Sequence, residues 1–406
     1  MHSARLLAFI SFLGGALYLP PAYGMDYPVE CAGTAVDTEI DAAIAQAQNG
    51  PVRVLLSSGT CLIESTHKLN GAIAFSIVGA GTAATIVKGQ GLAFPMFLVG
   101  LMAGGVDFDL EALTLQHAPN AVISMVFSAL QVDAVEFSDN TTVTVIDAEF
   151  SNITIAHSRF VGNHGDDSAI RAGGGPAYHL NVIDTTFVGN STTNHNGGAI
   201  SANASVVLDR VTFTGNTADN GYGGALYVSE IALTIRNSTF SGNSAAYGGA
   251  LAMTANYDSP GPTLRNVTMY GDTASTGGSE IYLGGSLPPP IAIFNSLVGG
   301  TCAGPAIAMT AHGSVESPGD TCGMAAMDNQ INVPDENLHL GPLIDNGGAT
   351  PTLYPNAGSI LIDAAGIDCE SVDQRDLVRG AGVCDVGAVE AGATLTDDIF
   401  ADNFAG

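Results

Sequence analysis

The chain repeats one motif four times, as Phe160-Val-Gly-Asn163, Phe187-Val-Gly-Asn190, Phe213-Thr-Gly-Asn216 and Phe240-Ser-Gly-Asn243, with successive copies 27, 26 and 27 residues apart. A second motif follows the later copies, as Gly197-Gly-Ala-Ile200, Gly223-Gly-Ala-Leu226 and Gly248-Gly-Ala-Leu251. Degenerate copies extend the register on both sides, with Phe137-Ser-Asp-Asn140 before it and Met269 with Gly277-Gly278 after it. Short alternating strands, such as Leu233-Thr-Ile235, precede the Phe positions.

A period in the mid-twenties with several short strands per repeat is typical of one coil of a parallel β-helix. Coils of that fold stack about 4.8 Å apart, so equivalent side chains form ladders. We therefore expect an all-β, right-handed parallel β-helix (solenoid) over residues 52–300, with room for roughly ten coils. The Phe ladder (Phe160, Phe187, Phe213, Phe240) fills the core, and the Asn ladder (Asn163, Asn190, Asn216, Asn243) hydrogen-bonds side chain to side chain at a turn. The Gly-Gly pair marks a corner that needs positive φ or a close approach of coils.

Both ends of the solenoid need covers, because an open coil exposes apolar side chains and strand edges. In residues 25–51, Ile40, Ala43, Ile44 and Ala47 recur at helical spacing, and Asp37 or Thr38 is placed to cap that helix. We predict an N-terminal helical cap there. Residues 301–395 are assigned to a small, disulfide-bearing C-terminal cap domain, and residues 396–406 to an acidic tail.

The net charge of the chain limits the kinds of partner that it can bind. The 406 residues include 39 acids and 11 bases, which gives a formal net charge of -28. Phosphate binding requires clustered Lys and Arg, so a nucleic-acid partner is excluded, and a pocket for polyanionic sugars is disfavoured. The chain has no Trp, so a sugar site would have to stack on Tyr or Phe.

The N-terminus predicts export. Arg5, an apolar run over residues 6–19 and the small-residue pattern Ala22-Tyr-Gly24 form a secretory signal peptide, which we assign to residues 1–24. No later apolar run reaches the length of a membrane span. We expect a protein that is secreted or held at the bacterial cell surface, in association with the outer membrane.

Six cysteines remain, at positions 31, 61, 302, 322, 369 and 384. An even number in an exported chain indicates three disulfides, and no pair has the C-x-x-C spacing of a metal site. Sequential pairing is the simplest of the fifteen connectivities. It predicts Cys31–Cys61, Cys302–Cys322 and Cys369–Cys384, all of them outside the regular stack.

The repeats over residues 137–285 resemble those of the polymorphic outer membrane proteins, and that resemblance implies a β-helical protein of the cell surface. The segment 301–395 resembles the choice-of-anchor Q domain, through Asp345-Asn-Gly-Gly348, Asp373-Gln-Arg375, Arg379 and Cys384-Asp-Val-Gly-Ala388 with Glu390. This second resemblance implies an exported bacterial protein and no particular activity. Asp397-Asp-Ile-Phe400 and the residues after it resemble a terminal sorting tag; a frayed acidic tail is the alternative.

The strongest catalytic candidate is His164-Gly-Asp166-Asp167, with Arg171 four residues further on. Paired carboxylates can divide acid and base work at a glycosidic bond, and Gly-Asp-Asp resembles a polygalacturonase motif. The second motif of those hydrolases would be His312-Gly-Ser314, which lies far beyond the one-coil separation that they show. A solvated turn is therefore favoured at Asp166–Asp167. A second set of charged residues lies in the C-terminal cap. We interpret it as a structural network, with catalysis as the alternative; its members are Asp373, Arg375, Arg379, Asp385 and Glu390.

No phosphate loop, zinc motif or nucleophile elbow is present, so no cofactor is expected, and no ligand pattern supports calcium. The functional hypothesis is a non-catalytic secreted or cell-surface β-helix protein, of the adhesion or envelope-associated kind. Its partner would be an unidentified extracellular ligand or envelope component. The alternative hypothesis is a polysaccharide-active enzyme, a lyase or glycoside hydrolase, on the same fold.

Overall fold

The structure is a computed structural model that describes residues 24–101, 105–255, 261–285, 290–305, 309–325, 328–366, 368–380 and 382–393. The predicted signal peptide, apart from Gly24, and the acidic tail lie outside the described residues. No helix within the described part of the chain is long and apolar enough to cross a membrane.

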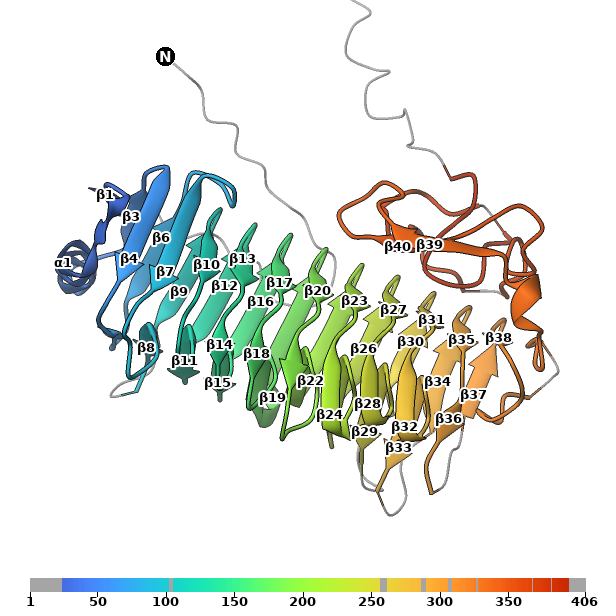
Figure 1. Ribbon diagram of the computed structural model, residues 1–406. Helices are drawn as coiled ribbons and strands as arrows, with labels where there is room; N and C mark the ends of the chain where they lie inside the picture. Colours follow the sequence, from blue (N-terminus) through green and yellow to red (C-terminus); the bar gives the residue numbers. More distant parts are fainter. Residues whose placement is uncertain are drawn as a thin grey trace, which may run out of the picture.

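The described chain folds as a parallel β-helix whose coils stack along a rod (Figure 1). One wall of the rod, which we call the Phe sheet, takes one strand from each coil. Its twelve strands among the described residues are β2 (Ala32–Ala35), β4 (Gly59–Ile63), β7 (Thr85–Gly89), β10 (Thr114–Gln116), β13 (Glu136–Ser138), β17 (Arg159–Val161), β20 (Thr186–Val188), β23 (Thr212–Thr214), β27 (Thr239–Ser241), β31 (Thr268–Tyr270), β35 (Leu297–Gly299) and β38 (Val315–Glu316).

A larger sheet of twenty strands wraps the rest of the rod in two halves, joined where β19 (Ile170–Ile183) and β22 (Ile200–Asp209) run through both. One half contains β5 (His67–Leu69), β8 (Phe97–Val99), β11 (Ile123–Val126), β15 (Ile146–Glu149), β25 (Leu226–Ser229), β29 (Leu251–Thr254), β33 (Ile281–Gly284) and β36 (Cys302–Ala303). The other half contains β1 (Met25–Val29), β3 (Val52–Leu56), β6 (Ala74–Val78), β9 (Asp107–Glu111), β12 (Ala129–Asp133), β16 (Asn152–Ala156), β26 (Leu233–Arg236), β30 (Thr263–Arg265), β34 (Ile291–Phe294) and β37 (Met309–His312).

A short third sheet closes the middle coils. It comprises β14 (Thr141–Thr142), β18 (His164–Gly165), β21 (Ser191–Thr192), β24 (Thr217–Tyr222), β28 (Ser244–Tyr247) and β32 (Thr273–Gly277). Between residues 52 and 300 the described Phe sheet has ten strands, as the repeat period predicts. The coils also extend beyond that range, because β1 and β2 precede it and β37 and β38 follow it.

The repeated Phe and Asn residues form the two ladders predicted for them. The Phe side chains of positions 137, 160, 187, 213 and 240 are buried and stack with ring centroids 4.7–4.8 Å apart. At the adjacent turn, Asn163 Nδ2 donates to Asn190 Oδ1 at 2.8 Å and to the Phe137 carbonyl at 3.0 Å. The same pair of bonds recurs in the next coils, so each buried amide has partners above and below it.

The two residues of the Gly-Gly motif answer two different requirements. Gly223, the first of its pair, has φ +71°, a conformation that side chains disfavour. Gly224, the second, lies so close to the next coil that an added Cβ would come within 2.3 Å of the Gly249 carbonyl oxygen. The motif therefore supplies both the positive φ and the close approach that the sequence left as alternatives.

The N-terminal helix α1 (Asp37–Ala47) buries Ile40, Ala43 and Ala47 against the first coils and lies at one end of the rod (Figure 1). The expected side-chain cap is wrong. Val36 is the N-cap, and the Asp37 carboxylate instead accepts the backbone N–H groups of Glu64 and Ser65. This carboxylate therefore anchors the helix to the following coil.

The C-terminal segment folds over the Phe sheet at the opposite end of the rod, with the 3-10 helix η1 (Asp335–Asn337) and the hairpin β39 (Leu340–Ile344) and β40 (Thr352–Pro355) (Figure 1). Leu297 and Val315, on the outer side of that sheet, form a second apolar core with Leu338, Leu361 and Val386. This segment is thus held to the flank of the last coils by a core of its own.

We predict that Phe213→Ala lowers the free energy of unfolding by ~3–5 kcal/mol, because it removes a fully buried ring between two stacked neighbours. Thr214→Ala is the control, since this half-buried residue follows Phe213 on the same strand. Chemical denaturation monitored by circular dichroism measures both changes. Equal losses in the two variants would mean that the stacked rings do not support the rod.

Candidate functional site

The Asp166–Asp167 segment is a turn tied to the next coil. The Asp166 carbonyl oxygen accepts Thr192 Oγ1–H at 2.7 Å and lies 2.7 Å from His195 Nδ1, and the exposed Asp166 carboxylate accepts Asn194 Nδ2–H. Asp167 accepts the Ser168 backbone N–H at 2.8 Å. These contacts are those of a hydrogen-bonded polar turn.

Arg171, the cation expected beside this pair, is directed at other carboxylates. Its guanidinium contacts Asp147 at 2.5 Å and Glu149 at 2.6 Å, both on the preceding coil, whereas Asp167 lies 3.8 Å away. Burial works against the charged guanidinium, but the carboxylates outweigh it and raise the pKa of Arg171. The cation therefore neutralises a surface acidic pair on β15.

The two histidines of the candidate motifs lie on distant coils. His164 is exposed on β18 and contacts Ser191 Oγ at 2.8 Å. His312 lies on β37 and contacts Asp328 at 2.7 Å. The structure thus brings neither histidine to the Asp166–Asp167 carboxylates as a hydrolase motif would require. Among the described residues, no cluster of three or more His, Cys, Asp or Glu is arranged to hold a metal ion.

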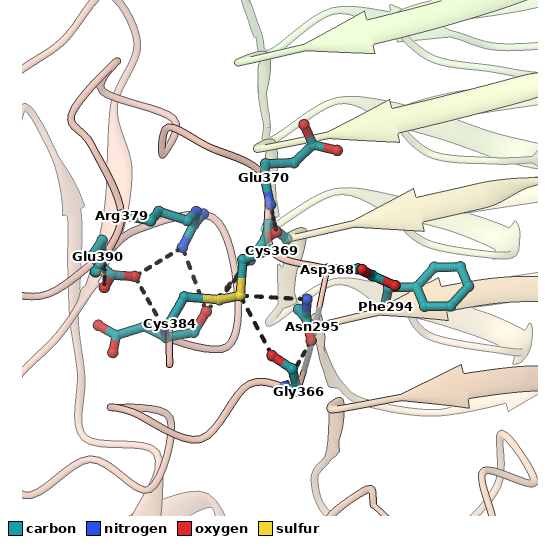
Figure 2. Close-up of a disulfide and its surroundings, with 12 residues drawn as sticks. Phe294, Asn295, Gly366, Asp368, Cys369, Glu370, Arg379, Cys384 and Glu390 are labelled. Atoms are coloured by element: carbon teal, nitrogen blue, oxygen red, sulfur yellow. Dashed lines mark hydrogen bonds and ion pairs between the residues drawn. A yellow bond between two sulfur atoms is a disulfide. The ribbon is translucent and has the colours of Figure 1, made fainter. Parts of the chain in front are cut away.

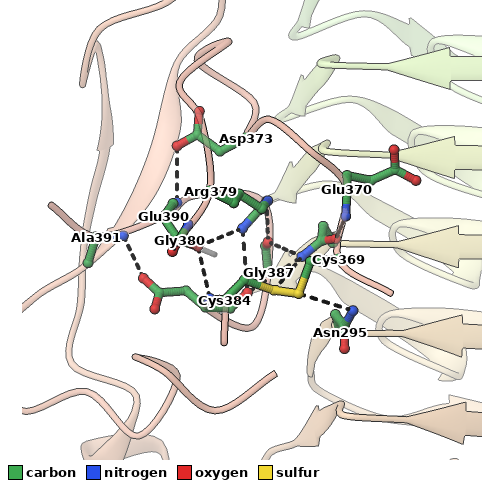
Figure 3. A network of polar contacts seen from close by, with 12 residues as sticks. Asn295, Cys369, Glu370, Asp373, Arg379, Gly380, Cys384, Gly387, Glu390 and Ala391 are labelled. Atoms are coloured by element: carbon green, nitrogen blue, oxygen red, sulfur yellow. Dashed lines mark hydrogen bonds and ion pairs between the residues drawn. A yellow bond between two sulfur atoms is a disulfide. The ribbon is translucent and has the colours of Figure 1, made fainter. Parts of the chain in front are cut away.

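The charged residues of the C-terminal segment that the sequence singled out form an internal network (Figure 3). Arg375 contacts Asp373 at 2.7 Å, and Arg379 contacts Glu390 at 3.3 Å. The Glu390 carboxylate also accepts the backbone N–H groups of Gly380 and Asp385. Burial lowers the pKa of Arg379 against the raising effect of its acidic neighbours. These side chains tie one loop of the segment to another, which fits the structural interpretation.

Gln374, between two of those charges, docks the segment on the rod. Its buried amide donates to Thr212 Oγ1 at 2.7 Å and accepts Thr239 Oγ1–H at 2.6 Å, and these threonines lie on the outer side of neighbouring Phe-sheet strands. The Asp373-Gln-Arg375 motif therefore combines one docking side chain with an ion pair that shapes its loop.

The structure contains the three sequential disulfides, Cys31–Cys61, Cys302–Cys322 and Cys369–Cys384. The prediction that all three lie outside the regular stack is wrong for two of them, because Cys61 lies on β4 and Cys302 lies on β36, inside the stack. The third lies at the junction of segment and rod, where Asn295 Nδ2 is 3.7 Å from the Cys369 sulfur and Asn295 Oδ1 accepts the Gly366 N–H (Figure 2).

Two buried carboxyls interrupt the ladders at the last of the regular coils. Asp272 takes the place of an Asn and accepts Asn243 Nδ2–H at 2.7 Å, and Glu280 takes the place of the motif Ala. Burial raises the pKa of Asp272 to about 6 and raises that of Glu280, whose ionised form is further opposed by Asp272. One carboxyl oxygen of Asp272 and both of Glu280 have no donor among the described residues, as expected when the pair holds a proton between its oxygens.

An exposed acidic strand lies on the outside of the large sheet. Asp107, Asp109 and Glu111 alternate along β9 and face outward. Burial, assisted by the charges of Asp107 and Glu111, raises the pKa of Asp109 to about 6, although Ser76 Oγ–H donates to it. The sequence analysis did not identify this strand. The alternation of acidic and apolar residues in Asp-Phe-Asp-Leu-Glu could have predicted a strand with an acidic outer face.

A groove opens beside the acidic strand, where the chain turns between the halves of the large sheet. It has a volume of about 320 Å³ and its aromatic wall is Phe127, Phe150 and Tyr178, each from a successive coil. Phe127 is 55% exposed and Phe150 41% exposed. Their rings stack at 5.1 Å, and Tyr178 meets Phe150 edge-on at 5.7 Å. Sequence reasoning did not find these residues, because they share no motif.

A second aromatic surface, the tyrosine cluster, lies further along the rod. It comprises four half-buried side chains whose rings contact one another: Tyr222, Tyr227, Tyr247 and Tyr282. Both surfaces fit the expectation that a sugar site in a chain without Trp would stack on Tyr or Phe.

Comparison with known proteins matches residues 210–229 to the Chlamydia polymorphic membrane protein repeat. No curated protein matches the chain. Among solved structures, the chain is similar to pectate lyase Pel9A, with 12% identity, a TM-score of 0.44 and coverage of 91% of this chain and 97% of that one. It is also similar to the A-module of the Azotobacter vinelandii mannuronan C-5 epimerase AlgE4, with 14% identity, a TM-score of 0.38 and coverage of 73% and 91%. The activities in these names belong to those proteins.

We predict that Gln374→Ala loosens the C-terminal segment by ~1–3 kcal/mol, because it leaves the buried Thr239 hydroxyl without its acceptor and removes the hydrogen bond that Gln374 donates to Thr212. Limited proteolysis should cut residues 340–393 faster in the variant. The control is Gln131→Ala, which truncates a half-buried Gln on the outer side of β12. Cleavage at the same rate in both variants would contradict the docking role of Gln374.

We predict that Asp272→Asn raises stability at pH 8 and flattens its pH dependence. The folded-state pKa of Asp272 is raised to about 6 from 3.8, so folding favours the protonated form. Stability from this group is therefore highest at low pH and falls as the pH rises toward 6, where a penalty of ~1–3 kcal/mol is complete. An amide at position 272 carries no such penalty.

Melting temperatures at pH 5 and pH 8 measure this effect. The control is Asp219→Asn, which removes the same charge from an exposed position on β24. A larger melting-temperature gain at pH 5 than at pH 8 in Asp272→Asn would contradict the protonated buried pair.

Proposed function

We propose that this protein is a non-catalytic β-helix protein, secreted or held at the cell surface, that binds an extracellular ligand or envelope component as adhesion proteins do. The observation that carries the proposal is the exposed aromatic groove of Phe127, Phe150 and Tyr178. Soluble proteins rarely expose such surfaces without a binding role. The stack of coils supplies a rigid rod on which the groove is displayed.

The location rests on three independent features. The signal-peptide pattern of residues 1–24 predicts export, and the three disulfides fit an oxidising compartment. The match of residues 210–229 to a polymorphic membrane protein repeat supports a place at the cell surface.

The strongest sequence candidate for catalysis supports this proposal through its contacts. The Asp166 turn is held by Thr192 and His195 of the next coil, and Arg171 is paired with the carboxylates of β15. A glycosidase needs a carboxyl that donates a proton and a second that acts opposite to it across the sugar. The Asp166 carboxylate instead accepts Asn194 Nδ2–H, and the Asp167 carboxylate accepts the Ser168 backbone N–H.

The alternative, a polysaccharide-active enzyme, is favoured by one observation. Asp109 faces outward, has a pKa raised to about 6 and lies next to Asp107, which lines the aromatic groove. A carboxyl with a raised pKa beside another carboxylate is the usual arrangement of an acid and a base in glycoside cleavage. Both functions would therefore use the same side of the rod.

We predict that the Asp166→Asn, Asp167→Asn double variant and the Asp109→Asn variant bind immobilised polysaccharides and extracellular-matrix proteins as the unmodified mature chain does. The same samples are assayed for reducing-sugar and unsaturated-product release from neutral and acidic polysaccharides, and no release is expected. Turnover by the unmodified chain that falls by several orders of magnitude in either variant would establish the enzyme instead.

A further inference from the structure

We propose that the groove of Phe127, Phe150 and Tyr178 is a binding site for an uncharged polysaccharide, with one sugar ring stacked on the open face of Phe127. This inference rests on the proposed function and names the ligand class of its groove. The groove crosses four consecutive coils, from Gly105 through Phe127 and Phe150 to Tyr178. Its volume of about 320 Å³ lies in the ~300–1,000 Å³ range of small-molecule sites.

The aromatic wall is built to hold Phe127 in place. Phe150 stacks on one face of the Phe127 ring at 5.1 Å with an angle of 11° between the rings, and Tyr178 contacts Phe150 edge-on. Phe127 nevertheless remains 55% exposed, so more than half of its surface is available to a ligand. A fixed, flat, apolar surface of this kind suits the C–H face of a sugar ring and loses little conformational entropy on binding.

The two phenylalanines lie at a corner of the coil where the backbone adopts positive φ. Phe127 has φ +49° and Phe150 φ +53°, and Gly174, which is in register with them on the next coil, has φ +112°. Other side chains adopt positive φ along the rod, as Glu230 does at +59°, so this conformation belongs to the coil and is not specific to the groove. The exposed rings add an unfavourable contact with water, which a stacked ligand would relieve.

Polar groups at the groove suit sugar hydroxyls. Asp107 lines the groove, is exposed and has no ion pair within the described chain, so its carboxylate can accept O–H donors. Asn152 accepts the His179 backbone N–H through Oδ1, and its side-chain N–H groups have no partner among the described residues. An acceptor and a donor beside an aromatic face form the usual environment of a bound sugar.

Charge selects among the ligands that could stack there. Asp107, Asp109 and Glu111 lie along the adjacent strand and the chain carries a net charge of -28, so uronic-acid and sulfated chains are repelled. A quaternary ammonium ion would need rings that surround it, whereas Phe127 and Phe150 stack on each other.

The test uses the full mature chain and soluble hexasaccharides of uncharged sugars: cello-, xylo-, manno-, malto- and chito-oligosaccharides. Isothermal titration measures their affinity for the unmodified chain and for Phe127→Gly. We expect binding to at least one of them, weakened at least tenfold in Phe127→Gly. The melting temperature of that variant should be equal or higher, because glycine relieves the positive φ.

Three variants make the result specific. Phe127→Tyr keeps the ring and should retain binding. Phe94→Ala removes another exposed Phe, 66% exposed and on the far side of β8, and Tyr247→Ala disrupts the tyrosine cluster. Both of these should bind as the unmodified chain does. Loss of binding in Tyr247→Ala with none in Phe127→Gly would overturn the groove and move the site to the tyrosine cluster.

Other outcomes separate this inference from the proposed function. Binding only to oligogalacturonate or alginate, only to cationic chitosan, or to none of the sugars would overturn the uncharged-polysaccharide site. If the unmodified chain still adheres to immobilised matrix proteins in those cases, the adhesion function stands with a different ligand. If it adheres to nothing, both proposals fail.

Discussion

The stacking of coils about 4.8 Å apart is the constraint on which the rest of the structure depends. It places equivalent residues directly above one another, so a buried group must be satisfied by its own copies. Asn163, Asn190 and Asn216 meet this requirement because each amide donates to the next one and to a Phe carbonyl below. An apolar side chain at one such position would remove a side-chain hydrogen bond from both neighbours. Each coil therefore depends on its two neighbours to satisfy its buried polar groups.

The two ends show how such a chain is terminated. At the first coils, α1 covers the core and its Asp37 is bonded to the turn of the next coil. At the last coils, the C-terminal segment lies along the flank, where Gln374 uses the outward Thr212 and Thr239 as a docking site. Asp272 and Glu280 stand where the Asn and Ala ladders stop, and burial raises the pKa of both carboxyls.

The sequence predicted those features that repetition enforces. Phe213 and Asn216 could be placed because four successive coils repeat the same residues there, and Gly223-Gly224 because positive φ and a close approach of coils favour glycine at that corner. Phe127 and Phe150 could not, since outward positions obey no ladder and change from coil to coil. The Asp272 and Glu280 pair was readable as two departures from the repeat, but their meeting depends on the fold of a coil. The prediction that Asp37 caps its own helix was wrong because a carboxylate at the start of a helix has several potential donors. Here the backbone N–H groups of the neighbouring coil are the donors.

Buried asparagines, two of them in the ladder, also restrict where this chain can be made. Asn140, Asn190, Asn237 and Asn266 each stand in an Asn-x-Thr or Asn-Ser-Thr acceptor sequence, and all four side chains are buried in the folded rod. In a eukaryotic secretory pathway these sites are read before the coils close. A glycan on Asn190 would occupy the space of the coil above and break the amide ladder at its centre. Production in a host that attaches N-linked glycans would therefore yield chains unable to complete the stack, whereas a bacterial host without that machinery leaves the ladder intact.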